Sequence, residues 1–279
     1  MASPLMLDFT AIDVFKDKPY EGNPLAIIRI PHGVSVTQER RKSTFLHENA
    51  SGAVEDKWTV DIIMTTKELP FTGHPTVGTA YYVLSRIAEE HGLKDGVVEV
   101  GFQLKTGPIG LRYDVAKKTA KAAIHHDVHV DYPIVSIVKG MTFVLIELES
   151  VAALAKVSLA GQSIEIHGLD QGWNESFIGK YFDVRTGKSE SGATQVSTRM
   201  IDGLLEDPAT GSAASDLAAY LSLNEGEAGK TLKYELVQGV EMGRRSEIFI
   251  EVVMAKDSGI QMVYLEGGAV KDMEDRLTV

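Results

Sequence analysis

Gly73-His74-Pro75-Thr76-Val77-Gly78-Thr79-Ala80 recurs in altered form as Glu206-Asp207-Pro208-Ala209-Thr210-Gly211-Ser212-Ala213. At a constant offset of 133 residues, His74 aligns with Asp207, and the two copies lie half a chain length apart in a sequence of 279 residues. Self-similarity at a fixed offset is a signal about the whole fold. We therefore predict two similar halves, each built around one copy of this motif.

Each copy of the motif predicts the start of a helix. Proline is favoured at the first helical position, and the backbone N–H groups of a first helical turn have no partner within the helix, so they attract anions. If the halves face each other, His74 and Asp207 would lie at the mouth of a shared cleft. Two ordinary capped helices are the alternative, and the repeat favours the two-sided active site.

Composition excludes several classes of protein. The chain is 44% hydrophobic, enough for two domains with substantial cores. Its 28 basic and 39 acidic side chains give a net charge of -11, which argues against a nucleic-acid-binding surface. No stretch is apolar enough to cross a bilayer and the N-terminus lacks a leader pattern, so we expect a cytoplasmic protein without membrane contact. The absence of cysteine excludes disulfides and thiol nucleophiles.

The hydrophobic pattern predicts an α+β fold, with a central helix in each half surrounded by strands. The predicted central helices run from Pro75 to about Gly92 and from Asp207 through Leu223. The predicted strands, which alternate or form short apolar runs, are 7–15, 25–28, 58–64, 97–104, 109–113, 122–130, 143–148, 177–184 and 248–253. A short helix is predicted over 152–159, and the polar pair at 117–118 sets the domains at 1–117 and 118–279.

Two local patterns leave alternatives open. Asn23 lies in a Pro- and Gly-rich loop, where its amide either forms a turn or holds a ligand or a neighbouring loop. His125, Asp127 and His129 fall on one face of a predicted strand, where they either bind a divalent metal or form a solvated face. Nothing nearby completes a ligand set and no nucleotide-binding glycine pattern is present, so we predict no metal and no cofactor.

Five segments together resemble the PhzF-like family of phenazine-biosynthesis isomerases. They are Asp13-Val14-Phe15, Gly22-Asn23-Pro24, 68–78, 206–213 and 238–244. The resemblance implies the fold shared with diaminopimelate epimerase and proline racemase: two similar domains, each a curved or barrel-like mixed sheet around a central helix, with the active site in the cleft between them. It also implies a homodimer that moves a proton within a small carboxylated or amino-bearing metabolite without a cofactor.

The resemblance assigns roles to individual residues. His74 and Asp207 fall on the pair that holds the substrate and assists proton movement, whereas the related racemases use two thiols that this chain lacks. Gly73, Gly211, Ser212 and Asn23 fall on substrate-binding positions. A histidine titrates near neutral pH, and an opposing carboxylate can anchor an amine or orient an acid.

One segment departs from the family pattern. The family's general base is a glutamate in an Asn-Leu-Ser-Glu-Thr segment, which is replaced here by 40–43, Arg-Arg-Lys-Ser. Lys42 or Ser43 occupies the glutamate position, depending on the gap, and Glu48 and Glu21 are possible substitutes. Two functions follow: an isomerase with a different base, or a protein of the same fold that performs another small-molecule reaction, such as cyclisation or dehydration, or only binds a ligand.

Overall fold

The computed structural model describes residues 6–34, 44–48, 57–64, 67–69, 71–105, 107–124, 129–130, 134–138, 140–159, 161, 164, 166, 173, 177–257 and 259–278. The chain forms two compact units. Unit 1 comprises Met1–Tyr20, Pro24–Ala122 and Gly267–Val279, and unit 2 comprises Glu21–Asn23 and Ala123–Glu266. The domains expected at 1–117 and 118–279 remain a prediction; the compact units are not contiguous in the sequence, because each takes a segment from the other's range.

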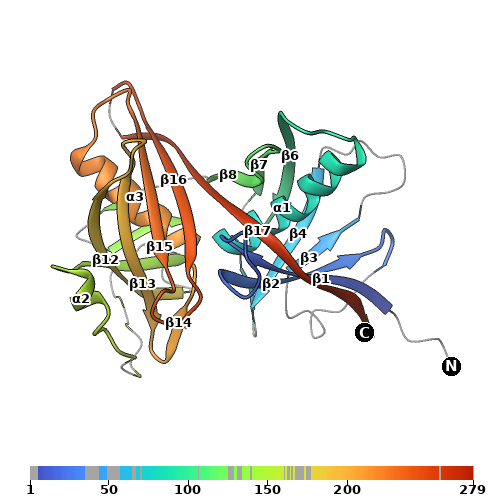
Figure 1. The fold of residues 1–279 in the computed structure, drawn as a ribbon, viewed down its shortest axis with the longest axis horizontal. Helices are drawn as coiled ribbons and strands as arrows, with labels where there is room; N and C mark the ends of the chain where they lie inside the picture. The colour runs from blue at the N-terminus through green and yellow to red at the C-terminus, as the bar shows by residue number, and fades with distance from the viewer. Residues whose placement is uncertain are drawn as a thin grey trace. The chain divides into compact units, whose positions relative to one another are not determined.

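The first part of the chain, up to residue 124, supplies most of unit 1 (Figure 1). Its elements are β1 (Met6–Val14), β2 (Asn23–Ile30), β3 (Thr44–His47), β4 (Lys57–Met64), β5 (Lys67–Leu69), α1 (Gly73–Glu90), β6 (Val97–Leu104), β7 (Gly107–Asp114) and β8 (Thr119–Ile124). The C-terminal part of β17 (Ile260–Thr278) completes the unit.

The strands of unit 1 pair into a closed ring. The order around it is β1, β2, β3, β4, β6, β7, β8 and β17, and β17 pairs back onto β1. The β1–β17 ladder is antiparallel and runs from Met6 opposite Thr278 to Val14 opposite Ala269. Closure leaves these strands without a free edge. The barrel-like mixed sheet predicted for this half is confirmed.

Helix α1 packs against β1, β3, β6 and β7 of this barrel. Its buried face includes Val77, Ala80, Leu84 and Ala88, which recur at helical spacing. Gly78 allows the close approach, because a Cβ atom there would lie 2.6 Å from side-chain atoms of β1 and β2. The helix ends where predicted: Gly92 has a φ of 65°, and Leu93 N–H bonds back to Ala88 O at 2.9 Å.

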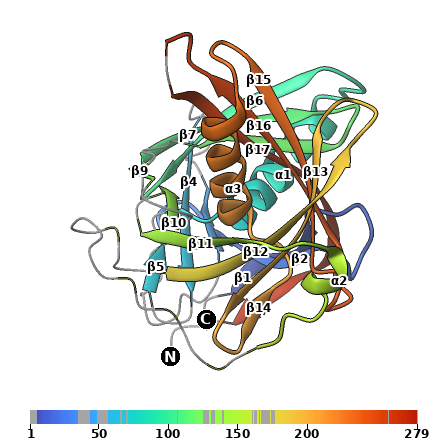
Figure 2. The same ribbon diagram turned by 90° about the vertical axis from the view of Figure 1, so that its left-hand side faces the viewer.

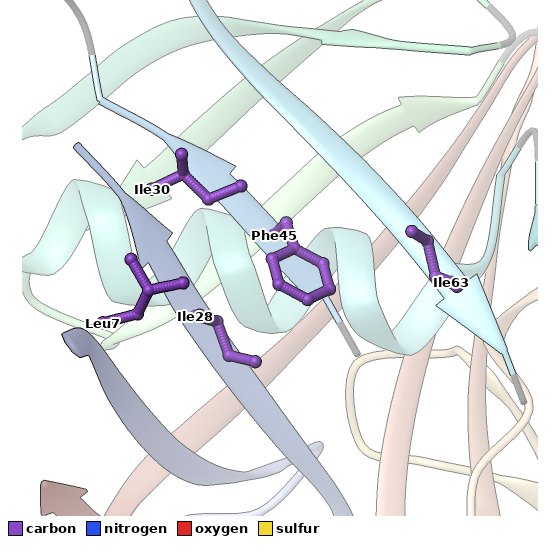
Figure 3. Packing of buried hydrophobic residues seen from close by; sticks show 5 residues of the cluster. All are labelled: Leu7, Ile28, Ile30, Phe45 and Ile63. Atoms are coloured by element: carbon purple, nitrogen blue, oxygen red, sulfur yellow. The ribbon is translucent and has the colours of Figure 1, made fainter. Parts of the chain in front are cut away.

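A cluster of buried side chains joins strands β1, β2, β3 and β4 of unit 1. Figure 3 shows Leu7 of β1, Ile28 and Ile30 of β2, Phe45 of β3 and Ile63 of β4 along one face of these strands. All five are at most 9% exposed. Removing apolar side chains of this size from water is the main force that stabilises such a sheet.

Unit 2 is built mainly from the second part of the chain (Figure 1). Its elements are β9 (His129–Val130), β10 (Ile134–Val138), β11 (Met141–Glu147), α2 (Val151–Leu154), β12 (Phe177–Lys188), β13 (Thr194–Asp202), β14 (Leu205–Asp207), α3 (Gly211–Glu225), β15 (Thr231–Gln238), β16 (Ser246–Met254) and the N-terminal part of β17.

The sheet of unit 2 curves around α3. Its pairing order is β9, β10, β11, β12, β13, β15, β16 and β17, with β14 paired to β13 as a short hairpin. Helix α3 contacts β10 and β11 near one end of this order and β15 and β16 near the other (Figure 2). The small buried side chains Ala213, Ala214, Ala218 and Ala219 permit this close packing. The central helix predicted for this half is confirmed.

The predicted start of the second helix is wrong. The motif places Pro208 at the helix start, but α3 begins at Gly211, and Asp207 is the last residue of β14, opposite Met200. In the other copy, α1 already begins at Gly73, so His74 is its second residue. The two motif copies therefore stand differently relative to their helices. Measured from the helix starts, Ser212 and not Asp207 corresponds to His74.

The predicted strands are otherwise present, with shifted ends. β1, β2, β4, the β6–β7 hairpin, β11, β12 and β16 cover predicted strands, whereas the helix predicted over 152–159 shortens to the single turn of α2. The strand predicted over 122–130 corresponds at its ends to β8 and β9, and residues 125–128 lie outside the described residues. Residues 117–118 belong to the turn between β7 and β8.

Within the described residues, no helix combines the length and apolar character needed to cross a membrane.

Candidate active site

Asp207 is held by hydrogen bonds to both carboxylate oxygens. Asn23 Nδ2 donates to Oδ1 at 2.8 Å, and Thr210 Oγ1 donates to Oδ2 at 2.6 Å. Hydrogen bonds to an ionised carboxylate stabilise its charge and fix its orientation. The side chain at the end of β14 is therefore positioned by one residue that follows it closely and one that is distant in the sequence.

Asn23 reaches Asp207 because its loop is bound to unit 2. Its amide also donates to Ala209 O at 2.9 Å, and the residue is only 5% exposed. The loop is fixed next to it: Gly22 N–H donates to Arg245 O at 3.2 Å, and Arg244 Nε donates to Gly22 O at 2.9 Å. These contacts favour the interpretation of Asn23 as a residue that holds a neighbouring loop.

Gln238 binds the same loop from the other side. The residue is fully buried, and its Nε2 donates to Asp207 O at 2.7 Å and to Thr210 Oγ1 at 3.0 Å. Its Oε1 accepts from Thr210 N–H at 3.2 Å and from the Tyr181 hydroxyl at 3.1 Å. Two donor and two acceptor positions are thus used, which fixes the amide orientation.

The loop after β15 also packs closely against the Asp207 loop. Gly239 has a φ of 76°, and a Cβ atom there would lie 2.7 Å from Pro208 O and 2.4 Å from Arg244 O. Only glycine fits both the backbone conformation and the space. Three of the five segments that carry the family resemblance therefore meet at Asp207. They are the segments at residues 22–24, 206–213 and 238–244.

Burial raises the pKa of Asp207 to about 6, although the hydrogen bonds from Thr210 and Asn23 lower it. Desolvation disfavours the charged form, and the donors compensate only in part. A carboxyl group with a pKa near the working pH can both donate and accept a proton. Asp207 thus has the properties of a proton-transfer group.

The N-terminus of α3 lies four residues after Asp207. In the described part of the chain, the backbone N–H groups of Gly211 and Ser212 make no hydrogen bond. The Ser212 Oγ atom is buried and also lacks a partner there. Free N–H groups at the start of a helix, together with an unpaired hydroxyl, can bind an anionic group. The predicted substrate-binding residues Gly211 and Ser212 therefore lie within five residues of Asp207 and present unused donors.

His74 lies at the start of α1 in unit 1. Burial lowers the pKa of His74 to about 3, so its imidazole is neutral at physiological pH. No hydrogen-bond partner of His74 lies among the described residues. The Oγ1 atom of Thr72, the residue before the helix, is buried and unpaired as well. Among the described residues, the backbone N–H groups of Gly73 and His74 have no hydrogen-bond partner, as those of Gly211 and Ser212 have none in unit 2. That His74 and Asp207 belong to one active site stays a prediction.

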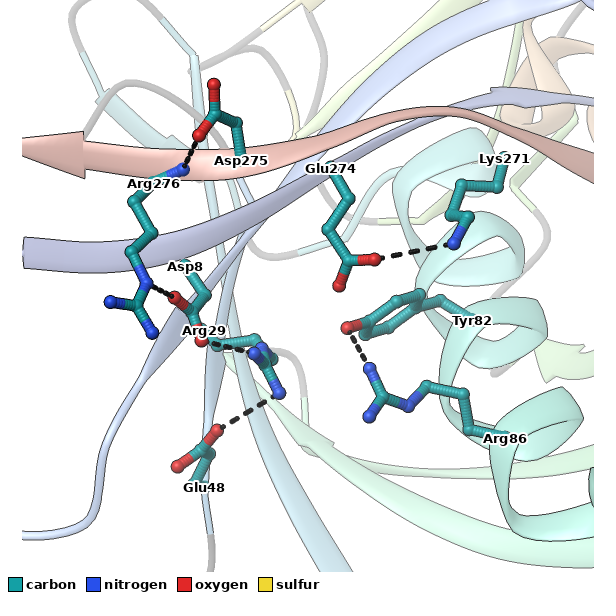
Figure 4. Close-up of polar contacts among 9 residues, drawn as sticks. All are labelled: Asp8, Arg29, Glu48, Tyr82, Arg86, Lys271, Glu274, Asp275 and Arg276. Atoms are coloured by element: carbon teal, nitrogen blue, oxygen red, sulfur yellow. Dashed lines mark hydrogen bonds and ion pairs between the residues drawn. The ribbon is translucent and has the colours of Figure 1, made fainter. Parts of the chain in front are cut away.

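The candidates for the missing base differ in their surroundings. Lys42 and Ser43 lie outside the described residues. Glu48 lies 3.7 Å from Arg29 Nη1, in a group of charged side chains with Asp8 and Arg276 (Figure 4). Glu21 belongs to the segment of unit 2 that carries Asn23. The ion pairs around Glu48 favour a structural role for that residue.

The alternative of a metal site at His125, Asp127 and His129 falls largely outside the described residues. Residues 125–128, which include His125 and Asp127, lie outside the described residues, and only the backbone of His129, the first residue of β9, is described. Within the described part of the chain, no group of three or more histidine or carboxylate side chains is placed to hold a metal ion.

Four residues that position Asp207 are not singled out by the sequence. Thr210 bonds the Asp207 carboxylate and Gln238 bonds its backbone oxygen. The Tyr181 hydroxyl bonds Gln238 in turn and lies 3.0 Å from Thr198 Oγ1. The sequence offers one sign of Gln238: it is a polar residue directly before Gly239, a glycine with positive φ. Tyr181 lies in a predicted strand, where the pattern could not distinguish a buried hydrogen-bonding tyrosine from an apolar core residue.

Comparison with known proteins identifies the family. Residues 108–275 match the family model of PhzC-PhzF, described as phenazine biosynthesis-like protein. The chain belongs to this family.

Similar proteins include the trans-2,3-dihydro-3-hydroxyanthranilate isomerase of Pseudomonas chlororaphis, which is 26% identical over 88% of this chain and 90% of its own length. The solved structure of a Bacillus anthracis phenazine biosynthesis protein of the PhzF family is similar with a TM-score of 0.74 and 17% identity, over 99% of this chain and all of that chain. A hydroxyproline epimerase from Agrobacterium vitis has a TM-score of 0.59 and 10% identity, over 98% of this chain and 93% of that one. The fold shared with the epimerases is thus confirmed.

Proposed function

We propose that this protein is an isomerase that moves a proton within a small metabolite carrying a carboxylate or an amino group, without a cofactor. The observation that carries this proposal is the environment of Asp207. Its carboxyl group has a pKa of about 6, is hydrogen-bonded on both oxygens, and lies four residues before a helix start whose donors have no partner among the described residues. The reaction class is supported by the family to which the chain belongs and by its similarity to a protein that is named an isomerase.

Each residue receives a role consistent with its surroundings. Asp207 donates and accepts the proton, and Asn23, Thr210 and Gln238 keep its carboxyl group in one orientation. The N–H groups of Gly211 and Ser212 and the Ser212 hydroxyl bind the substrate carboxylate. His74 and the Gly73 backbone also contact the substrate. The roles of His74 and Gly73 are supported by the duplicated motif and the resemblance, and the resemblance also supports a homodimer.

A second candidate function follows from the replacement of the glutamate segment by residues 40–43. Without its base, the protein would keep the ligand-binding groups but catalyse a different reaction or none. The two functions differ in one observable, because proton transfer through a titrating side chain exchanges the moving hydrogen with solvent.

The test is deuterium uptake in heavy water, followed by mass spectrometry and proton NMR. The panel comprises trans-2,3-dihydro-3-hydroxyanthranilate, which the Pseudomonas chlororaphis relative is named for, and small cyclic and acyclic amino acids. We expect at least one compound to gain deuterium at a single carbon with the protein present. Compounds that bind but gain none would favour the second function and contradict the first.

A further inference from the structure

Unit 1 contains a pocket of about 440 Å³ that the proposed reaction does not use. It lies beside the C-terminal half of α1, where Ile12 of β1, Tyr82 of α1 and Tyr113 of β7 form buried walls. Arg86 lies twelve residues after His74, or about 18 Å along the helix at 1.5 Å per residue. The pocket therefore lies at the opposite end of α1 from His74.

Arg86 is held in this pocket without an acidic partner. Its Nη1 donates to the Tyr82 hydroxyl at 2.7 Å, and its guanidinium carbon lies 5.3 Å from the centre of the Tyr82 ring. Glu89 and Glu90 also line the pocket, three and four residues further along the helix, a spacing at which ion pairs form readily. No carboxylate lies within ion-pair distance of Arg86 in the described part of the chain. The guanidinium thus retains unused donors.

Of the other charged side chains that line the pocket, two form an ion pair with each other and three have no ion-pair partner among the described residues. Lys271 and Glu274 of β17 form an ion pair at 3.3 Å, and Figure 4 shows this pair on one side of Tyr82 and Arg86 on the other. Lys118, in the turn before β8, has no ion-pair partner among the described residues, and Glu89 and Glu90 have none either. Unpaired charges of both signs therefore line one pocket. A ligand of a single charge sign would be repelled by half of them.

Two tyrosines supply an aromatic surface with free hydroxyl groups. The rings of Tyr81 and Tyr113 meet edge to face, with centroids 5.6 Å apart. Burial raises the pKa of both, that of Tyr113 to about 12, and Glu89 adds to the effect, so both hydroxyls remain protonated donors. Neither hydroxyl has a hydrogen-bond partner within the described residues. Buried aromatic walls with a few unpaired polar groups are typical of small-molecule sites.

We propose that this pocket binds a small aromatic zwitterion, such as an aromatic amino acid. Arg86 and Lys118 bind its carboxylate, Glu89 and Glu90 bind its ammonium group, and its ring packs beside Tyr81 and Tyr113. The volume suits a molecule of this size.

Isothermal titration calorimetry with L-phenylalanine tests this binding. We expect saturable binding with a Kd on the order of 1 mM. N-acetyl-L-phenylalanine, which lacks the ammonium group, and 2-phenylethylamine, which lacks the carboxylate, should each bind at least about tenfold more weakly, the effect of losing one charged contact. Absence of saturation at about 10 mM L-phenylalanine, or equal binding of the three compounds, would overturn the proposal.

Variants locate the site. Arg86→Gln and Glu89→Gln should each weaken L-phenylalanine binding about tenfold, and both positions are exposed enough to tolerate the change. Arg112→Gln is the matched control, because Arg112 is an exposed arginine of β7 that pairs with Glu99 outside the pocket. Asp207→Asn should leave binding unchanged. Unchanged binding in both pocket variants, or loss of binding in Asp207→Asn, would overturn the assignment, and neither result depends on isomerase activity.

Discussion

Asn23 Nδ2 lies 2.8 Å from Asp207 Oδ1, although the two residues are 184 positions apart in the sequence. This hydrogen bond, like those from Thr210 and the Ala209 backbone, lowers the pKa of Asp207 against the larger effect of burial, which raises it to about 6. The loop that carries Asn23 is therefore part of the Asp207 site, and its contribution can be measured through the titration of that carboxyl group.

Asn23→Ala should raise the pKa of Asp207 further. The amide stabilises the charged carboxylate, and a charge-assisted hydrogen bond of about 1.5 kcal/mol corresponds to about one pKa unit. The measurement is the titration of the Asp207 side-chain carbonyl by carbon-13 NMR. Asn224→Ala is the control, since the amide of this exposed residue bonds only its own helix, at Tyr220 O. An unchanged or lowered pKa in Asn23→Ala would contradict the role given to Asn23.

Gly239→Ala should destabilise the protein and disturb the Asp207 loop. The added Cβ atom would lie 2.7 Å from Pro208 O, in addition to the strain of a φ of 76°. Gly243→Ala is a matched control, because Gly243 has a φ of 73° with no atom within 4 Å of the added Cβ. Positive φ alone costs about 1 kcal/mol, so we expect Gly239→Ala to lower the free energy of unfolding by at least about 2 kcal/mol more than the control. Equal losses in urea unfolding would show that the close contact is unimportant.

Asp216→Asn should flatten the dependence of stability on pH. Asp216 of α3 is buried and accepts from Ile137 N–H at 2.7 Å through Oδ1, and its Oδ2 has no partner among the described residues. Burial raises the pKa of Asp216 well above its usual value, so the folded state binds the proton more tightly than the unfolded chain. Its contribution to stability is complete below the unfolded pKa and is lost as the pH rises toward the folded pKa.

The wild type should therefore lose up to about 1.4 kcal/mol per pH unit relative to Asp216→Asn above about pH 4, until the folded pKa is reached. Urea unfolding at several pH values between 4 and 8 measures this difference, with exposed Asp95→Asn as the control. Parallel curves for the wild type and Asp216→Asn would contradict a buried titrating carboxyl group at this position.

Much of the fold could be predicted because local patterns determine it. Alternation identified β1, and Pro75 of the motif and the terminal glycine identified α1 and its end at Gly92. No prediction covered β17, whose residues gain a sheet only by pairing with β16 and β1, far away in the sequence. Likewise, Pro208 suggested a helix start, but Gln238 holds the backbone of Asp207 and Thr210 outside the helix. Contacts between distant segments decide such details, and local propensity does not contain them.

The candidate site shows the same division. Asp207, Ser212 and Gly211 could be identified from the repeated motif, and Asn23 from its loop composition and the resemblance. Their grouping within unit 2 depends on Arg244 and Gln238, whose hydrogen bonds bring the loop at residue 22 to the Asp207 segment. No local pattern predicts which distant amide will meet a given carboxylate.

Glu48→Gln should leave catalysis nearly unchanged. The carboxylate is paired with Arg29, which also pairs with Asp8, so its removal affects a surface ion pair and not a proton-transfer group. We expect kcat/KM to change less than about threefold, whereas loss of a general base costs about 100- to 10,000-fold. Lys42→Ala should have an equally small effect. A loss in the larger range for one of the two variants, with folding intact, would identify that residue as the base.

The central claim is that Asp207 transfers the proton, and the rate of deuterium uptake by the responsive substrate in Asp207→Asn tests it most directly. The asparagine preserves the size of the side chain and an oxygen that can accept a hydrogen bond, but it cannot exchange a proton. Asp202→Asn, five residues earlier on β13, is the matched control. The account predicts that uptake falls about 100- to 10,000-fold in Asp207→Asn and stays within about threefold of wild type in Asp202→Asn. Wild-type uptake by a folded Asp207→Asn protein would contradict it.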